Sequence, residues 1–449
     1  MNTLDMSIVN VAMPALKAAF HTTFAVSEWF VLSYTLVITI LLLTFGRLGD
    51  LFGRRRLYVT GTLVFAAGSL SCGLSGSALM MILARAFQGI GASMMMSAGP
   101  ALVTEAFPAR ERGKALGFIG SAVALGLLAG PLVGGLIVQY AGWRWMFFIN
   151  IPVGLVLAGV IEKRVSGFDT SCGGRLDVPG AALMALSVAT LVMGLFFGEA
   201  LGWGSPASMT IFGAAVIFGA AFILLEQRVS NPLLDLALFR KPDFSIGAFA
   251  GWTNYAALMP VPVFIPFYLA DLLHYQPHQI GPIIASGPIT LAIVAPLAGA
   301  LSDRIGPRIL TTVGLLTVGG ALLWMRTLTP ESTWVQVVMR LACASFGSAL
   351  FTSPNSSAVM GSVKRKDLGI ASGTISLVRN LGMVSGVAIA GAIITTVKRG
   401  AYVSGELAGN GVEHVVFLQG LKSAYFACAL IAFIGAAVSA TRAPQTSEE

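Results

Sequence analysis

The stretch Gly46-Arg-Leu-Gly-Asp50-Leu-Phe-Gly53-Arg-Arg-Arg56 is a short charged loop between two apolar runs. A related loop, Gly299-Ala-Leu-Ser-Asp303-Arg-Ile-Gly306-Pro-Arg308, occurs in the second half of the chain. Alignment of the two copies matches the glycines, the aspartate and one arginine: Gly46 with Gly299, Asp50 with Asp303, Gly53 with Gly306 and Arg55 with Arg308. The repeat predicts a duplicated membrane unit and therefore two related helical halves.

The composition of the whole chain is that of a membrane protein. Hydrophobic residues make up 56% and charged residues 11%, and the mean hydropathy is +0.82, which excludes an ordinary soluble domain. A helix needs about 20 mostly apolar residues to cross a bilayer. Such runs occur near 4–20, 27–46, 57–75, 78–100, 114–139, 145–161, 178–199, 208–225, 244–271, 280–301, 309–326, 333–354, 369–396 and 419–440. The sequence thus predicts an all-α protein with fourteen transmembrane helices, and duplicated halves of this kind build many secondary transporters.

Lys and Arg residues predict the orientation of the helices. These residues favour cytoplasmic loops near helix ends, and most of the 28 Lys and Arg residues follow even-numbered helices or lie in the C-terminal tail. We therefore expect both termini in the cytoplasm. The net charge of +8 then reflects membrane topology and indicates no nucleic-acid partner.

The sequence offers no motif for catalysis or for metal binding. The four cysteines have neither CxxC nor Cys/His spacing, so neither a disulfide framework nor a metal site is expected. The motifs GxxxxGK[ST], HExxH and GxSxG are missing, which argues against direct ATP use and against an enzyme. We expect no cofactor, and we expect the energy for any transport to come from an ion gradient.

Several motifs resemble those of the major facilitator superfamily, whose signature loop is similar to the stretch from Gly46 to Arg56. The motifs of the first, fourth and fifth helices are Leu4-Asp5-Met-Ser-Ile-Val-Asn10-Val-Ala-Met-Pro14, Arg85-Ala-Phe-Gln88-Gly89-Ile-Gly91 and Gly126-Leu-Leu-Ala-Gly130-Pro131-Leu-Val-Gly134-Gly135. With the fourteen predicted helices and the stretch Trp143-Arg-Trp-Met-Phe-Phe-Ile-Asn-Ile-Pro-Val-Gly154, the chain resembles the fourteen-helix drug:proton antiporters of the EmrB/QacA type.

This resemblance implies a major facilitator fold of two six-helix bundles plus two extra linking helices. The implied domains are an N-terminal bundle (1–161), a linker with two transmembrane helices (162–243) and a C-terminal bundle (244–449). The implied function is export of hydrophobic drugs or toxic small molecules in exchange for protons, by alternating access, from a monomer in the bacterial inner membrane. The partners would be the substrate, protons and the lipid bilayer, and a periplasmic adaptor protein would be a further partner.

Proton coupling requires an ionisable group at membrane depth, where charge is costly and usually functional. Asp5 is the clearest acid and Arg85 the clearest base in the predicted helices. A carboxylate near an arginine stays ionised, whereas desolvation favours its protonated form. Movement of Asp5 between two such environments would load and release a proton. The alternatives are that the two residues form a fixed structural ion pair, or that Asp5 is a polar plug in the first helix.

Other polar residues of the predicted helices are candidates for lining a substrate cavity. They share a polar side chain within an apolar run: Asn10, Tyr34, Gln88, Asn254, Tyr255, Arg379 and Asn380. Each of them could instead satisfy a hydrogen bond between helices.

Two further groups have roles that the resemblance implies. The first group would gate the cytoplasmic side of the transporter: Gly46, Asp50, Gly53, Arg54, Arg55, Asp303 and Arg308. The alternative is that the arginines of this group are only topology anchors. The second is associated with export in the family: Gly126, Gly130, Pro131, Gly134 and Gly135. Glycines four residues apart form a smooth helix face on which a neighbouring helix can pack, and ordinary packing is therefore the alternative.

Two other functions stay open. The same fold could export a specific metabolite, an amino acid or a lipid. A function of another class is a membrane receptor or partner-dependent component that transports nothing alone. Resistance of a host cell, lost in Asp5→Asn, would favour the drug antiporter, whereas binding without flux would favour the receptor.

Overall fold

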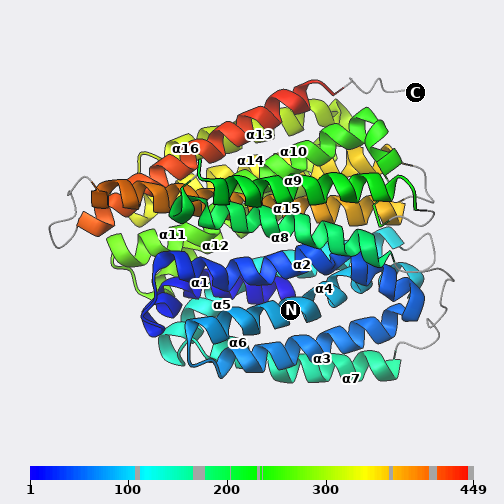
Figure 1. Cartoon of the computed structure of the whole chain (residues 1–449), viewed down its shortest axis with the longest axis horizontal. Helices are drawn as coiled ribbons and strands as arrows, with labels where there is room; N and C mark the ends of the chain where they lie inside the picture. Colours follow the sequence, from blue (N-terminus) through cyan, green and yellow to red (C-terminus); the bar gives the residue numbers. More distant parts are fainter. Residues whose placement is uncertain are drawn as a thin grey trace. The chain divides into compact units, whose positions relative to one another are not determined.

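The computed structural model describes residues 1–106, 112–164, 177–202, 204–229, 233–234, 236–363, 368–403 and 412–442. In these residues the regular structure is helical (Figure 1). The chain divides into two compact units, Met1–Gly194 with Pro206–Leu236, and Leu195–Ser205 with Ala237–Glu449.

The first unit contains nine helices among its described residues: α1 (Asn2–Ala19), α2 (Phe24–Phe52), α3 (Arg54–Gly73), α4 (Ala78–Ala106), α5 (Arg112–Tyr140), α6 (Trp145–Phe148), α7 (Asn150–Arg164), α8 (Val178–Leu201), whose last turns belong to the second unit, and α9 (Pro206–Glu226). The closest helix pairs are α3 with α4, α2 with α4, α1 with α5 and α3 with α7. Helices α8 and α9 contact each other, since Ser187 donates a hydrogen bond to the carbonyl of Ala215 at 3.0 Å.

A 3-10 helix, η1 (Leu236–Arg240), crosses the boundary between the two units. The described part of the second unit then contains α-helices and one π-helical turn, η2: α10 (Pro242–Leu258), α11 (Pro260–Phe267), η2 (Tyr268–Leu272), α12 (Pro277–Ile305), α13 (Pro307–Met325), α14 (Trp334–Gly361), α15 (Leu368–Val403) and α16 (Val412–Ala440). The close pairs α13 with α14, α12 with α14, α10 with α15 and α13 with α16 repeat the pairing order of the first unit. The duplication inferred from the two charged loops is therefore visible in the packing.

The two charged loops make the same turn. Gly53 between α2 and α3 has φ of +96°, and Gly306 between α12 and α13 has φ of +81°. Residues with a Cβ rarely adopt this conformation, so glycine is required at the equivalent place in both copies. Gly46 lies inside α2 and takes no part in the turn.

Two of the predicted helices are divided in the structure. The run 145–161 forms α6 and α7, which separate at Ile149, and the run 244–271 forms α10, α11 and η2. The second division begins at Met259, directly before Pro260, and α11 also contains Pro262 and Pro266. Because proline lacks an amide hydrogen and clashes with the preceding turn, it interrupts regular helical hydrogen bonding.

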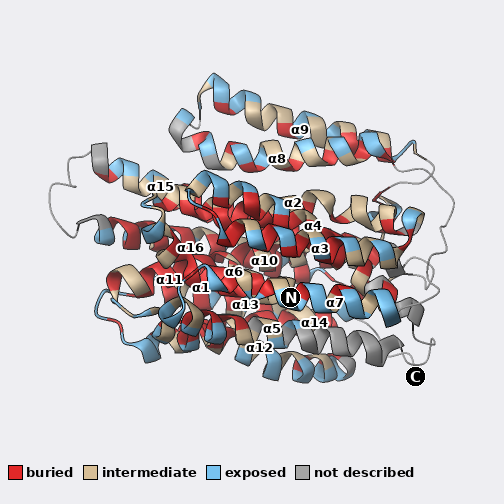
Figure 2. Cartoon of the chain, turned by 90° about the horizontal axis from the view of Figure 1, so that it is seen from below, coloured by how far each residue is buried: buried red, intermediate tan, exposed pale blue. Residues whose placement is uncertain are grey.

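Eleven of the helical segments in the described residues are long and apolar enough to cross a membrane. Helices α1 and α3 are not among them, and α5 contributes only the shorter apolar stretch Leu128–Tyr140. Most of α9 is exposed or half-buried, whereas the segment from α10 to η2 is mostly buried (Figure 2). The exposed apolar side chains of α9, which include Val216 and Ile217, suit contact with lipid.

Candidate functional site

Asp5 and Arg85 form a buried ion pair in the first unit. Arg85 Nη1 of α4 lies 2.6 Å from Asp5 Oδ2 of α1, and each side chain is 1% exposed. Arg85 Nε also donates to the carbonyl of Phe30 in α2 at 2.9 Å. A buried ion pair is stable only when good geometry and further hydrogen bonds offset the loss of hydration, and the remaining contacts of this cluster provide such bonds.

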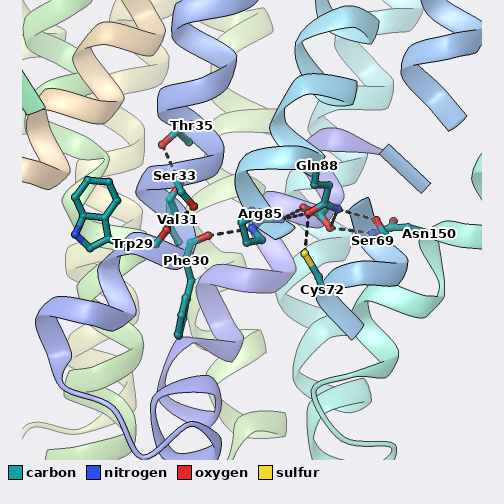
Figure 3. A network of polar contacts seen from close by, with 11 residues as sticks. Trp29, Phe30, Val31, Ser33, Thr35, Ser69, Cys72, Arg85, Gln88 and Asn150 are labelled. Atoms are coloured by element: carbon teal, nitrogen blue, oxygen red, sulfur yellow. Dashed lines mark hydrogen bonds and ion pairs between the residues drawn. The ribbon is translucent and has the colours of Figure 1, made fainter. Parts of the chain in front are cut away.

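The second carboxylate oxygen of Asp5 accepts two side-chain hydrogen bonds. Figure 3 labels the two donors, Gln88 and Asn150, together with Arg85. Gln88 Nε2 donates to Asp5 Oδ1 at 3.0 Å, and Asn150 Nδ2 of α7 donates to the same oxygen at 2.8 Å. Gln88 Nε2 also donates to Ser69 Oγ of α3 at 2.7 Å, and Gln88 Oε1 accepts a hydrogen bond from Arg85. The carboxylate of α1 therefore bonds directly to α4 and α7, and Arg85 and Gln88 extend the cluster to α2 and α3.

The local sequence explains this convergence. Arg85 and Gln88 are three residues apart, which places both side chains on one face of α4. Asp5 lies in the first turn of α1, where the helix dipole favours negative charge. Asn150 is the first residue of α7.

Two polar groups at the ion pair, Arg85 Nη2 and the Tyr34 hydroxyl, are buried without a hydrogen-bond partner among the described residues. Asn10 Oδ1, further along α1, is unpartnered in the same part of the chain. The Tyr34 ring lies 4.1 Å from Arg85 Cζ, a distance at which a cation and an aromatic face attract each other. Since buried polar groups are normally satisfied, these atoms mark a place where water or a ligand could bind.

The glycines of α5 pack directly against the segment of α1 that carries Asp5. A Cβ at Gly130 would collide with Ser7, and a Cβ at Gly134 would lie 3.0 Å from Ile8 Cγ2. At Gly126 the nearest atom would be Leu4 N, at 3.4 Å. Pro131 and Gly135 are buried beside them. The glycine face therefore determines how closely α1 approaches α5.

The predicted gate residues are described in part. Arg55 Nη2 lies 3.2 Å from Glu162 Oε1 and also donates to the carbonyl of Glu162, which joins α3 to the end of α7. Arg54 is half-buried in the first turn of α3, and Arg308 is half-buried in the first turn of α13. The side chains of Asp50 and Asp303 lie outside the described residues.

The predicted cavity residues fall into two groups. Tyr34 and Gln88 belong to the cluster around Asp5, Asn10 is buried further along α1, and the other four lie in the second unit. Asn254 of α10 donates to Ser348 Oγ of α14 at 3.1 Å, which makes it a contact between helices.

The remaining three predicted cavity residues also lie on α10 and α15. Tyr255 and Arg379 line a cavity within the second unit. Asn380, the residue after Arg379, is buried but does not line this cavity. Its Nδ2 has no hydrogen-bond partner in the described part of the chain.

A buried arginine, Arg442, lies near that cavity. Arg442 follows the end of α16, and its Nη2 donates to Asn355 Oδ1 of α14 at 3.0 Å. Its Nε is 3.7 Å from Asp243 Oδ1 at the start of α10. Burial lowers the pKa of the Arg442 guanidinium, and the Asp243 carboxylate partly opposes this shift.

The sequence predicts no role for Ser69, Asn150 or Asn355, and it places Arg442 only among the cytoplasmic Lys and Arg residues. Asn150 stands in the quoted stretch from Trp143 to Gly154, and an asparagine inside an apolar run was a signal for a buried polar contact. Arg442 follows the last apolar run, where an arginine is indistinguishable from a topology anchor. In the described residues no group of three or more His, Cys, Asp or Glu residues could hold a metal ion.

Comparison with known proteins identifies the family of this chain. The family described as Major Facilitator Superfamily matches residues 1–235 and 244–448. The chain is 33% identical over 397 residues to the riboflavin transporter RibZ of Clostridioides difficile (strain 630), which covers 86% of this chain and 84% of that protein. It is 32% identical over 392 residues to the multidrug resistance protein Stp of Mycobacterium tuberculosis (strain CDC 1551 / Oshkosh), with 87% of this chain and 73% of that protein covered.

Solved structures show the same fold. A bacterial homologue of the human lysosomal transporter Spinster, in an inward-facing and unoccupied conformation, matches with a TM-score of 0.71 at 17% identity, over 98% of this chain and 93% of that chain. With the apolar helices described above, these matches show a multi-pass membrane transporter and not an enzyme. The chain belongs to the major facilitator superfamily.

Proposed function

We propose that this protein is a secondary active transporter that exports hydrophobic drugs or toxic small molecules in exchange for protons. The observation that carries the proposal is the buried cluster in which Arg85, Gln88 and Asn150 converge on Asp5. An acid at such a position is costly and usually functional. The relationship to a multidrug resistance protein supports the drug class of substrate.

In the proposed mechanism Asp5 carries the proton. Protonation would neutralise the carboxylate and weaken its ion pair with Arg85. The carboxylate now accepts three hydrogen bonds, and protonation would turn one of its oxygens into an O–H donor. Arg85 would then be a buried cation without its counterion, a state that favours rearrangement of α1 against α4. Release of the proton restores the pair. Protonation is thereby linked to helix position, which is what antiport requires.

We assign the remaining groups supporting roles. The glycine face of α5 would guide the movement of α1, and the loops around Gly53 and Gly306 would close the cytoplasmic side. Fourteen transmembrane helices of the EmrB/QacA arrangement, with the three domains given above, would lie in the bacterial inner membrane with both termini in the cytoplasm. A monomer is expected, and a periplasmic adaptor would be a further partner.

The test is substrate-dependent proton release in inverted membrane vesicles energised by respiration. A pH-sensitive dye would follow the lumen while cationic, neutral and anionic hydrophobic compounds are added in turn. The proposal requires release with at least one compound and no release in Asp5→Asn of equal abundance. If the wild-type protein binds such compounds but gives no release with any of them, the proposal is wrong and a non-transporting receptor is favoured.

One observation favours a second candidate, export or uptake of a specific metabolite. RibZ, at 33% identity, is a riboflavin transporter, so a single metabolite such as riboflavin is a candidate substrate for this chain. Competition of riboflavin with a transported drug in the same vesicles distinguishes a metabolite transporter from a drug exporter. Riboflavin flux without any drug response would favour the metabolite transporter.

A further inference from the structure

A cavity of about 100 Å³ lies within the second unit, between α10, α14 and α15. On α10 its lining residues Gly247, Gly251 and Tyr255 recur every four residues and therefore share one helix face. The missing side chains of the two glycines leave space on that face. A Cβ at Gly247 would collide with Val359, whereas the nearest atom to a Cβ at Gly251 would be Asn355 Nδ2 at 3.7 Å. Gly251 is thus the glycine that keeps the cavity open.

Arg379 of α15 is the charged residue of the lining. Its Nε is buried without a hydrogen-bond partner among the described residues, and the structure shows no ion pair for it in the same part of the chain. The lining contains no Asp or Glu. A guanidinium at membrane depth is normally paired, so Arg379 has donors available for an anionic group.

A second positive charge lies directly behind the lining residue Asn355. Asn355 Nδ2 donates to the Gly247 carbonyl at 3.0 Å, and its Oδ1 accepts from Arg442 at 3.0 Å. The Arg442 side chain is 1% exposed, but its Asp243 partner is 40% exposed and 3.7 Å away. Asp243 therefore neutralises Arg442 only in part. Arg379 and Arg442 together make the electrostatic potential in the cavity positive.

We propose that this cavity binds the acidic group, a carboxylate or phenolate, of an amphipathic substrate, with Arg379 as its hydrogen-bond donor. Phe351, Ile375 and Val378 give the same cavity apolar walls, which suit the ring or chain beside the acidic group. A cavity of roughly 150 Å³ can hold benzene, so the smaller one here takes the acidic end of a substrate and not the whole molecule. The inference rests on the proposed transport function and names its substrate class.

The test compares three ligands with one apolar body: 2-naphthoate, 2-naphthamide and 2-naphthylmethylamine. Their dissociation constants for the full chain in detergent are measured by titration calorimetry. The amide oxygen can accept one hydrogen bond from Arg379, but only the carboxylate adds a negative charge and a second acceptor oxygen, so naphthoate should bind about tenfold more tightly than the amide. Arg379→Gln should remove this preference, and Arg379→Lys should retain part of it because the positive charge stays.

Two glycine variants test the location of the site. Gly251→Leu fills the cavity and should weaken naphthoate binding at least tenfold. Gly320→Leu is the matched control, since Gly320 lies in another helix, is exposed and has no atom within 4 Å of its Cβ position. Unchanged affinity of Arg379→Gln for the amide shows that the variant is folded.

The inference is wrong if the amine binds as tightly as the carboxylate, or if Arg379→Gln keeps the full preference for naphthoate. Proton release in vesicles separates its failure from failure of the proposed function. Arg379-dependent naphthoate binding without proton release supports the site and contradicts antiport. Proton release driven by basic compounds and unaffected by Arg379→Gln supports antiport and contradicts the site.

Discussion

Ser7 of α1 packs directly against Gly130 of α5, with no room for a Cβ at the glycine. Ser7 lies two residues after Asp5, so this contact fixes the distance between the glycine face and the segment that carries the acid. Small residues allow helices in membranes to approach closely. The glycines of α5 and the cluster around Asp5 are therefore parts of one packing arrangement.

Gly130→Ala should destabilise the protein and reduce proton-coupled flux. The added methyl group collides with Ser7, and overpacking of this kind typically costs about 1–3 kcal/mol. Gly126→Ala is the matched control, because the nearest atom to its Cβ position is 3.4 Å away. Thermal unfolding in detergent and proton release in vesicles measure the two effects.

Removal of the Ser7 side chain tests whether the collision with Ser7 causes the instability of Gly130→Ala. The double variant Ser7→Gly/Gly130→Ala should recover stability that Gly130→Ala alone loses, since contacting residues show coupled effects in a double-mutant cycle. Additive losses in the cycle would mean that the collision with Ser7 is not the reason for the defect.

Asp5→Asn should abolish substrate-driven proton release and lower stability. Asparagine keeps the shape of the side chain but leaves Arg85 as a buried cation, and breaking one side of a buried pair costs about 3–5 kcal/mol. The double variant Asp5→Asn/Arg85→Gln removes both charges, so it should regain much of the stability but none of the proton release.

This pair of variants separates coupling from a purely structural ion pair. The structural alternative predicts that the double variant recovers transport together with stability. Recovery of proton release would therefore contradict the assignment of Asp5 as the proton carrier.

The sequence was sufficient for the repeated fold but only partly for the site. Asp5, Arg85 and Gln88 could be predicted because ionisable and amide groups in apolar helices have few alternatives to a functional or paired role. Asn150 could not be placed, since its contact with Asp5 joins residues 145 positions apart and depends on the break at Ile149. Both helix breaks have a local cause, because Met259 directly precedes Pro260, and Pro152 in the first turn of α7 cannot donate to the carbonyl of Phe148, the last residue of α6. The sequence does not show, however, which distant side chain Asn150 would meet.

Asn150→Ala should weaken both the stability and the coupling. The change removes the donor at 2.8 Å from Asp5 Oδ1, and a hydrogen bond to a charged group contributes about 1.5–3 kcal/mol. Asn150→Asp places a second carboxylate beside the first and should be worse than alanine because like charges repel. Thermal unfolding of the purified variants ranks them, and an aspartate variant as stable as the wild type would argue against this contact.

The ion pair between Arg55 and Glu162 should contribute far less than the cluster around Asp5. Glu162 is 61% exposed and Arg55 19% exposed, and exposed pairs are typically worth about 0–1 kcal/mol and are screened by salt. Glu162→Gln should therefore change the unfolding temperature little, and less still at 0.5 M salt, a concentration at which the Debye length is roughly 4–5 Å. Arg55→Ala should have the larger effect, because it also removes the hydrogen bond to the Glu162 carbonyl, which the glutamine variant keeps. If Glu162→Gln impaired transport as strongly as Arg55→Ala, the carboxylate itself would have to take part in closing the cytoplasmic side.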